Sequence, residues 1–418
     1  IVTLTGDTIQ TSDSTSHPTL TTQIDTPFLT LIGVQGMEVS GSAIAALADT
    51  QERGTKALEL SLMLDVSGSM ADNNKLEDMK DAAQDFLTIV MPDDLEVQNR
   101  RVGLIPFSDR VNVGSFAPAA TGLPATRQVQ TGTTNTYVFS TTSFSYMSLT
   151  SCGTRVRSIT AHANLSTSAS QAYCQANFTT RRVNNQTQYY TPARVTVVNP
   201  VYSTYNLRTC VTERQGTDAY EETAPQNGSY IGWYNPTSGE SSQYSSSGGC
   251  SIPAIKTLTT ERQELSDYIE TFQTYSGTAG HVGTAWSWYM LSPEWNSFWS
   301  GSQEPVEAYT ETETVKAAVI MTDGQYNSNY ASASASQQAI EICTKMKAQG
   351  IKVYTIGFDM STNVNDPARQ TLMQCASPNK YYFPYNGQQL RQAFQEIGNS
   401  LVNIVHISSD DETVIIQE

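Results

Sequence analysis

The sequence predicts an α/β fold: a doubly wound, mostly parallel sheet with a small β-element from the termini and a long disulfide-stapled β/loop insertion. Three observations support this prediction. Strand patterns alternate with amphipathic helical patterns in two parts of the chain, as in sheets covered by helices on both faces. A segment rich in Ser, Thr, Tyr and Asn separates those parts and holds four of the six cysteines. Short β-like runs between turn residues occupy the first 57 residues.

The chain of 418 residues carries 24 basic against 40 acidic residues, a formal net charge of −16, and its 39% hydrophobic content supports a core. Such an acidic surface repels nucleic acid and anionic membranes, so no nucleic-acid partner is expected. The acidic, Ser/Thr-rich composition favours an extracellular or cell-surface protein. No apolar run approaches the roughly 18–20 residues that span a bilayer. The chain begins at Ile1, so a membrane anchor outside it is compatible with the sequence.

Residues 1–57 are expected to form an N-terminal β-element, because short β-like runs there are separated by Ser, Thr, Asp and Pro. The runs are residues 1–5, 20–24, 28–34 and 37–40. At the other end, residues 407–418 contain Thr413-Val-Ile-Ile416, which predicts a C-terminal strand able to pair with this element.

Residues 58–406 are expected to form the α/β domain, interrupted by an insertion at 114–253. Before the insertion, the pattern predicts a strand at 58–64, a helix at 75–90 and a strand at 101–107. After it, the pattern predicts strands at 315–321, 351–358 and 380–383, and helices at 335–349 and about 388–404.

The insertion shows only scattered β-like runs, which predicts a β/loop segment held by disulfides. An even number of cysteines favours disulfides formed in an oxidising compartment, and sequential pairing is the favoured arrangement. Cys343–Cys375 would then join a helix to a later loop. The alternative is that one or two are free buried thiols. The six candidates are Cys152, Cys174, Cys210, Cys250, Cys343 and Cys375.

The most informative motif is Asp65-Val-Ser-Gly-Ser69, which places a carboxylate and two hydroxyls on one loop after a predicted strand. Open α/β sheets bind ligands at this edge, although a helix N-cap and turn is the ordinary alternative. Asp323 follows the strand at 315–321 and is expected at the same edge. Thr278 is the candidate from a third loop, and Thr284 is its rival. Hard oxygen donors of this kind suit Mg²⁺.

Together the motifs Asp-x-Ser-x-Ser, Gly-Thr and Thr-Asp-Gly, in this order and on these elements, resemble the von Willebrand factor A family, whose sheet is Rossmann-like. The resemblance covers about residues 58–114 and 253–404. In that family the motifs form the metal-ion-dependent adhesion site (MIDAS). The resemblance implies a divalent cation, Mg²⁺ or else Ca²⁺ or Mn²⁺, held by Asp65, Ser67, Ser69, Thr278 and Asp323. It also implies a protein or cell-surface partner that offers an Asp or Glu carboxylate.

Further segments resemble bacterial TadG-like proteins of the Flp/Tad tight-adherence pilus systems. These segments are residues 27–33, 210–214, 286–293, 353–358 and 375–377. The resemblance implies a pilus-associated protein whose partners include pilus subunits or copies of itself.

The leading interpretation is an extracellular, metal-dependent adhesion or binding protein that is not an enzyme. One alternative is a structural component of a pilus or surface assembly, whose metal only stabilises the loops. A metal-dependent hydrolase ranks lower, because the sequence holds no Gly-x-Ser-x-Gly elbow, P-loop or His-based triad. His281 is expected to pack near the site. Four tryptophans predict either a ligand-stacking platform or, the favoured interpretation, core packing: Trp286, Trp288, Trp295 and Trp299.

Overall fold

The computed structural model describes residues 15–16, 19–24, 37–42, 45–46, 56–93, 99–232, 243–330 and 334–406. The chain forms two compact units, one of Ile1–Lys56 with His406–Glu418 and one of Ala57–Val405. In the smaller unit, β2 (Thr19–Ile24) pairs antiparallel with β3 (Met37–Ser42), and β1 (Thr15–Ser16) pairs with β4 (Ala45–Ala46). The strands expected at 1–5, 28–34 and 413–416 lie outside the described residues.

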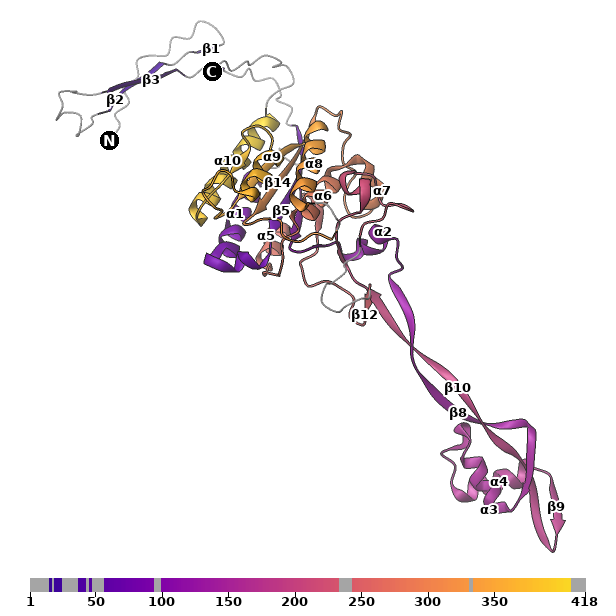
Figure 1. Cartoon of the computed structure of the whole chain (residues 1–418). Coiled ribbons are helices and arrows are strands. Elements are labelled where there is room, and N and C mark those ends of the chain that lie inside the picture. Colours follow the sequence, from indigo (N-terminus) through magenta and orange to yellow (C-terminus); the bar gives the residue numbers. More distant parts are fainter. Residues whose placement is uncertain are drawn as a thin grey trace. The chain divides into compact units, whose positions relative to one another are not determined.

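The larger unit is built on a sheet whose centre is parallel, with the strand order β6-β5-β14-β15-β16. Figure 1 labels its two central strands, β5 and β14. The bounds of these strands are β5 Ala57–Asp65, β6 Arg100–Phe107, β14 Thr314–Thr322, β15 Lys352–Gly357 and β16 Tyr381–Tyr382. Antiparallel strands extend the β6 side: β7 (Val111–Asn112), β11 (Cys210–Val211) and β13 (Lys256–Thr259). The predicted, mostly parallel sheet is therefore confirmed, with an antiparallel margin.

Helices cover both faces of this sheet, so the central strands β5 and β14 are buried on both sides. In β5, Leu60 and Leu62 pack into a core with α1 (Lys75–Val90), α5 (Arg262–Glu270) and α10 (Gly387–His406). Met63 points into a second core with α6 (Gly280–Leu291), α8 (Ala335–Ala348) and α9 (Pro367–Cys375). The doubly wound arrangement is confirmed. No helix in the described ranges is long and apolar enough to cross a membrane.

The sequence located β5, α1, β6, β14, α8, β15 and α10 to within two residues, but it did not predict α5, α6 or α9. Helix α6 lacks an amphipathic pattern because all of its residues are buried. Two short helices, α2 (Ala117–Thr121) and α7 (Asn296–Trp299), accompany the same core.

The four tryptophans belong to this core, and a ligand-stacking platform is excluded. Trp286, Trp288, Trp295 and Trp299 are each no more than 2% exposed. The ring of Trp295 stacks on that of Tyr289, with centroids 4.2 Å apart.

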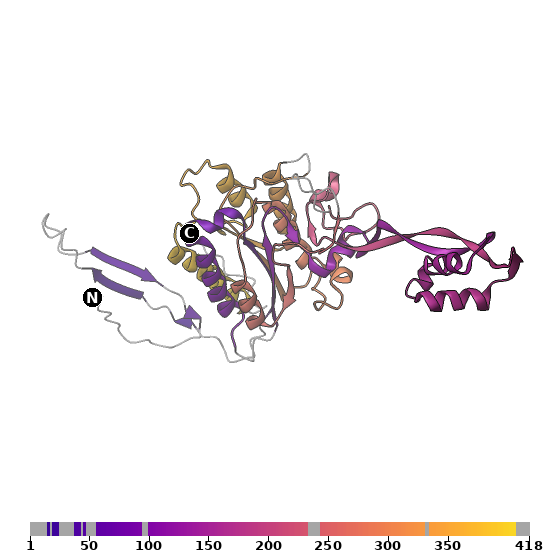
Figure 2. The ribbon, with the colours of Figure 1, turned by 90° about the horizontal axis from the view of Figure 1, so that it is seen from below.

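The insertion contains a two-stranded antiparallel ribbon made of β8 (Thr126–Met147) and β10 (Gln186–Leu207). Two helices, α3 (Leu149–Arg157) and α4 (Thr167–Asn177), lie with β9 (Thr180–Val183) at one end of the ribbon (Figure 1). Figure 2 shows both helices packed beside the ribbon. We call residues 126–207 the arm and the rest of the larger unit the body. The base of the arm carries β12 (Tyr244–Ser245), which pairs with the end of β10.

The helices α3 and α4 correct the expectation of a purely β/loop insertion. Their signals were two serine N-caps. Ser148 accepts a hydrogen bond from the Ser151 N–H at 3.2 Å, and Ser166 accepts one from the Ala169 N–H at 3.1 Å.

Three disulfides pair the cysteines in the expected sequential order: Cys152–Cys174, Cys210–Cys250 and Cys343–Cys375. None of the six is a free thiol. Cys343–Cys375 joins α8 to the last residue of α9, not to a loop as expected.

Replacing both Cys152 and Cys174 by alanine is expected to unfold the end of the arm and leave the body intact. The hydrophobic cluster there buries only Cys152, Val156, Cys174 and Tyr189, and a disulfide of this loop length contributes about 3 kcal/mol. Hydrogen exchange should accelerate across α3 and α4 and stay unchanged in α1. As a control, replacing Cys343 and Cys375 should instead destabilise the body. Equal loss of protection in α1 for both double variants would contradict an independent arm.

Candidate functional site

The parallel pairing of β5 with β14 places two carboxylates at one edge of the sheet. Leu64 lies opposite Met321 in the register. Asp65 is the last residue of β5, and Asp323 directly follows the last residue of β14. Asp65 is fully buried and Asp323 is 7% exposed.

The loop after β5 turns its two serines towards these carboxylates. The backbone N–H of Ser67 donates to Asp65 Oδ1 at 2.7 Å. The Ser67 and Ser69 hydroxyls lie 3.2 Å apart, and the Ser69 hydroxyl donates to Asp323 Oδ1 at 2.6 Å. Four of the five predicted site residues therefore come together in one cluster, which we call the Asp65 cluster.

Thr322 is a further member that the sequence analysis did not identify. Its hydroxyl donates to Asp65 Oδ2 at 2.6 Å, so both carboxylate oxygens of Asp65 accept hydrogen bonds. The signal was its place directly before Asp323 at the end of a strand.

Thr278 lies on a neighbouring loop. The Tyr275 N–H donates to the Val66 carbonyl at 2.7 Å, which ties this loop to the Asp65 loop. Thr278 is held through its backbone: its N–H donates to Asn327 Oδ1 at 2.9 Å. Within the described residues, the Thr278 hydroxyl makes no hydrogen bond to the Asp65 cluster.

The rival residue Thr284 lies in the core. It belongs to α6, is fully buried, and its hydroxyl donates to the Gly280 carbonyl at 2.8 Å. Of the two threonines, only Thr278 lies on a loop bonded to the Asp65 loop.

Lys75 is a second residue that the sequence analysis did not identify. It is the first residue of α1, and its ammonium group lies 3.0 Å from Asp323 Oδ2 and 3.6 Å from Asp359 Oδ2. Lys75 is only 8% exposed. Its positive charge therefore compensates the carboxylate of Asp323.

Electrostatics make the Asp65 cluster a place that favours positive charge. Burial and the neighbouring Asp323 raise the pKa of Asp65 from 3.8 to about 7, while hydrogen bonds from Ser67 and Thr322 lower it. The donors are all hard oxygens, which fits Mg²⁺, Ca²⁺ or Mn²⁺ better than a soft metal. Across the described residues, no group of three or more His, Cys, Asp or Glu side chains is arranged to hold a metal. A cation here would depend on hydroxyls and water as well as on two carboxylates.

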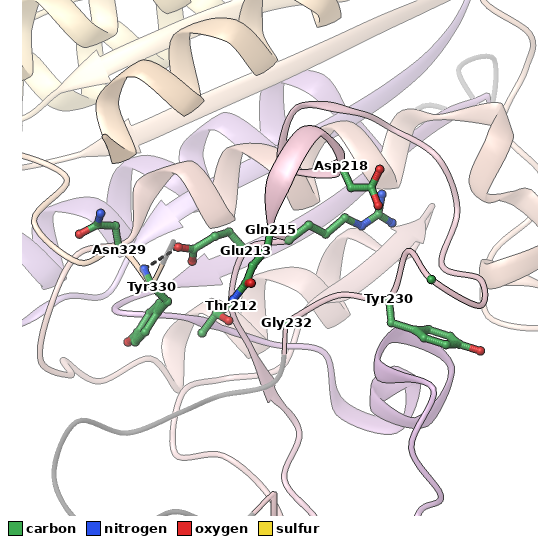
Figure 3. A pocket seen from close by; sticks show the side chains of 10 residues that line it. Thr212, Glu213, Gln215, Asp218, Tyr230, Gly232, Asn329 and Tyr330 are labelled. Atoms are coloured by element: carbon green, nitrogen blue, oxygen red, sulfur yellow. Dashed lines mark hydrogen bonds between the residues drawn. The ribbon is translucent and has the colours of Figure 1, made fainter. Parts of the chain in front are cut away.

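Figure 3 shows a pocket of about 700 Å³ whose lining includes Asn329 and Tyr330, which closely follow Asn327, the partner of Thr278. Residues 212–215 line one part of it, and Asn329 and Tyr330 line another. The backbone N–H of Tyr330 donates to Glu213 Oε1 at 2.5 Å. Because Asn327 holds Thr278, one short segment connects the candidate site with the pocket wall.

His281 supports that wall from behind. It is fully buried, and its Nε2 lies 3.3 Å from Glu213 Oε2. Burial alone would raise the pKa of Glu213, but the hydrogen bond and charge of His281 hold it below its ordinary value. His281 is therefore a buried packing partner of Glu213.

Comparison with protein families adds one match: residues 242–397 fit the family model described as von Willebrand factor type A domain. The chain contains a von Willebrand factor type A domain. The matched range includes Thr278 and Asp323. Strand β5, which carries Asp65, lies between β6 and β14 in the same sheet and so belongs to the same type A domain. A comparison with curated proteins found no match.

Among solved structures, the chain is similar to the von Willebrand factor domain of the type V pili tip protein Mfa5 from Porphyromonas gingivalis. The identity is 10%, the TM-score is 0.41, and 85% of this chain and 98% of that chain are covered. For the pilus adhesin SpaC from Lactobacillus rhamnosus GG, the identity is 11% and the TM-score is 0.37, and 96% of this chain and 34% of that chain are covered. For a mutant of the PilB minor pilin from Streptococcus sanguinis, the identity is 11% and the TM-score is 0.38, and 97% of this chain and 78% of that chain are covered. At these scores the similarities support no conclusion about function.

The raised pKa of Asp65 predicts a pH-dependent stability for the metal-free type A domain. Between about pH 4 and 7 the folded protein keeps a proton on Asp65 that the unfolded chain has released. The free energy of unfolding is therefore highest below pH 4, where Asp65 is protonated in both states, and it falls as the pH rises to about 7. Asp65→Asn keeps a neutral side chain at every pH. In EDTA at pH 8 it should be more stable than wild type by roughly 1–4 kcal/mol, and at about pH 3.5, below the unfolded-state pKa, the two should melt alike. Calorimetry that finds the variant less stable at both pH values would contradict this.

Lys75→Met is expected to strengthen divalent-cation binding about tenfold, because it removes a positive charge that occupies Asp323 Oδ2. Titration calorimetry with Mn²⁺ measures this. Lys80→Met is the matched control, because Lys80 lies on the same helix and pairs with Glu77 at 2.8 Å. Weaker binding by the Lys75 variant would mean that its ammonium group organises the site.

Proposed function

We propose that this chain is an extracellular, metal-dependent adhesion or binding protein, associated with a pilus or cell surface and without enzymatic activity. Asp65, Ser67, Ser69 and Asp323 would hold a divalent cation, with Thr278 as a further oxygen donor from the neighbouring loop. The observation that carries the proposal is the convergence of two buried carboxylates and two serine hydroxyls at the edge of a type A sheet.

The chemistry of these donors favours binding an acidic partner. Serine and threonine hydroxyls are neutral, and Lys75 already pairs with Asp323, so these donors leave part of the charge of a bound divalent ion uncompensated. Mg²⁺ prefers six oxygen ligands at roughly 2.0–2.1 Å. A partner Asp or Glu carboxylate would supply the missing negative charge through a directed, charge-assisted contact. Mg²⁺ is the first choice, with Ca²⁺ and Mn²⁺ as alternatives.

The neighbouring pocket would contribute selectivity. One carboxylate on an ion identifies no particular protein, so the surroundings must distinguish one acidic partner from another. The pocket wall built by Glu213 and Tyr330 belongs partly to the end of the insertion. We infer that the insertion shapes the surface on which the partner rests.

A structural role for the ion is the second candidate, and a specific observation favours it. The cluster already bonds the β5 loop to the β14 loop through Ser69 and Thr322, and α1 to the β14 loop through Lys75. An ion there would tighten loops that are linked without it. This candidate suits a component of a pilus or surface assembly whose partners are pilus subunits or copies of itself.

Asp323→Ala and excess EDTA are both expected to abolish binding to an immobilised poly-glutamate surface in buffer containing Mg²⁺ and about 500 mM NaCl, which screens simple charge attraction to the arginines of the arm. Biolayer interferometry with the whole chain measures this. Asp72→Asn is the matched control, because Asp72 is an exposed carboxylate on the segment after Ser69; it should bind like wild type. A lowered melting temperature in EDTA without any carboxylate-dependent binding would support the structural role instead. Undiminished binding in EDTA would contradict metal dependence.

A further inference from the structure

The charges of this acidic chain are strongly segregated. Residues 110–212 contain eight arginines and no lysine, aspartate or glutamate, so all 40 acidic residues lie elsewhere. Six of these arginines belong to the arm. The whole chain has a formal charge of −16 even though it includes these arginines, so the residues outside the arm carry a net charge more negative than −16. The arm is therefore a basic element attached to an acidic body.

The arm arginines are not neutralised by ion pairs within the described chain. Arg155 donates to the Pro192 carbonyl at 3.2 Å, and Arg181 donates to Gln188 Oε1 at 2.9 Å. The guanidinium of Arg181 also lies 3.8 Å from the ring centroid of Tyr146. These neutral contacts position the arginines but leave their charge uncompensated. All six are exposed or half-buried: Arg127, Arg155, Arg157, Arg181, Arg182 and Arg194.

A hollow of about 610 Å³ at the helical end of the arm brings two arginines together. Arg155 from α3 and Arg194 from β10 line it. The other polar lining residues are all hydroxyl donors: Thr150, Ser151, Thr154 and Ser158. Guanidinium and hydroxyl groups without a competing carboxylate form a site for an oxyanion, and the planar guanidinium matches a carboxylate well.

The length of the ribbon separates this charge from the body. The ladder runs from Asn206 opposite Thr126 to Tyr189 opposite Met147. Arg194, opposite Phe139, lies 12 residues (206 − 194) from Asn206 at the base, which at about 3.3 Å per residue is roughly 40 Å of ribbon. Screening at physiological salt reaches only about 8 Å. The positive end of the arm therefore acts on partners largely independently of the acidic body.

We propose that the basic end of the arm docks on the acidic body of a second copy of this chain. Two bodies repel each other, as do two arms, and only arm against body is attractive. Acidic side chains are exposed on α1 and α5, which are joined by a hydrogen bond from Gln84 to Glu270 at 3.1 Å. Glu77, Asp81 and Glu264 there pair with Lys80, Arg391 and Lys256. The exposed acidic residues for which the described chain shows no ion pair are Asp267 and Glu270 on α5 and Glu261 directly before it.

This contact is head-to-tail, because the two surfaces are different, and it can repeat from copy to copy. It goes beyond the proposed cation site and does not use it. The arm has no aspartate or glutamate, so it cannot supply a carboxylate to a bound ion.

Multi-angle light scattering of the whole chain tests the proposal. In about 20 mM salt the protein should form dimers and larger species as its concentration rises, and about 500 mM salt should dissociate them. The double variant R155Q/R194Q should require at least about tenfold higher concentration to associate. R181Q/R182Q replaces two exposed arginines on β9 and should also weaken self-association. Because these side chains do not line the hollow, this variant still tests the proposal if R155Q/R194Q disturbs the fold of the hollow. EDTA should have no effect, which separates this result from failure of the cation site.

K345Q/K352Q is the matched control, because it removes two positive charges from the body instead of the arm; it should associate at least as well as wild type. A chain that stays monomeric in low salt would overturn the proposal, as would equal losses in arm and control variants. Vesicles containing phosphatidylglycerol and a soluble anionic polysaccharide serve as competing probes. Arm-dependent binding to either, without self-association, would overturn the second copy as partner.

Discussion

The pairing of β5 with β14 forces two carboxylates into a dry environment at one edge of the sheet. Parallel strands in register end side by side, so Asp65 and Asp323 cannot avoid each other unless the central sheet changes. Their repulsion and burial are unfavourable, and the neighbouring groups reduce that cost. Ser67 and Thr322 donate to Asp65, and Lys75 pairs with Asp323. The loops after both strands are therefore shaped by charge compensation as much as by packing.

The order of motifs in the sequence predicted this edge because strand ends and hydroxyl-bearing loops can be read from local pattern. Asp65, Ser67, Ser69 and Asp323 all follow apolar strands, and they meet as expected. The role of Lys75 was not predicted, because α1 was identified by its apolar positions and a lysine at the start of a helix ordinarily faces solvent. Only the tertiary structure brings it to Asp323. Helix α6 was not predicted for a different reason. All of its residues are buried, so the sequence lacks the apolar periodicity that identifies an amphipathic helix.

The net charge of the whole chain does not describe the charge of the insertion. A whole-chain charge of −16 argues against anionic partners, yet residues 110–212 contain only positive formal charges. Strands β8 and β10 are largely exposed on both faces, so the alternation of apolar and polar residues that marks a half-buried strand is weak in them. Their pairing was not predictable from pattern alone. The cysteines were more informative, because their sequential pairing closes the end of the arm and its base separately.

The way the arm joins the body has a mechanical consequence. Both strands of the ribbon run between the same two ends, so tension applied at the helical end would pull on two covalent backbones side by side, not on the hydrogen bonds between them. At the base, that load passes into β7 and β11, which pair with each other, and the Cys210–Cys250 disulfide reinforces the point of entry. Force would thus reach the margin of the sheet through covalent links. Strands β5 and β14, which carry Asp65 and Asp323, lie further in and would be shielded from it.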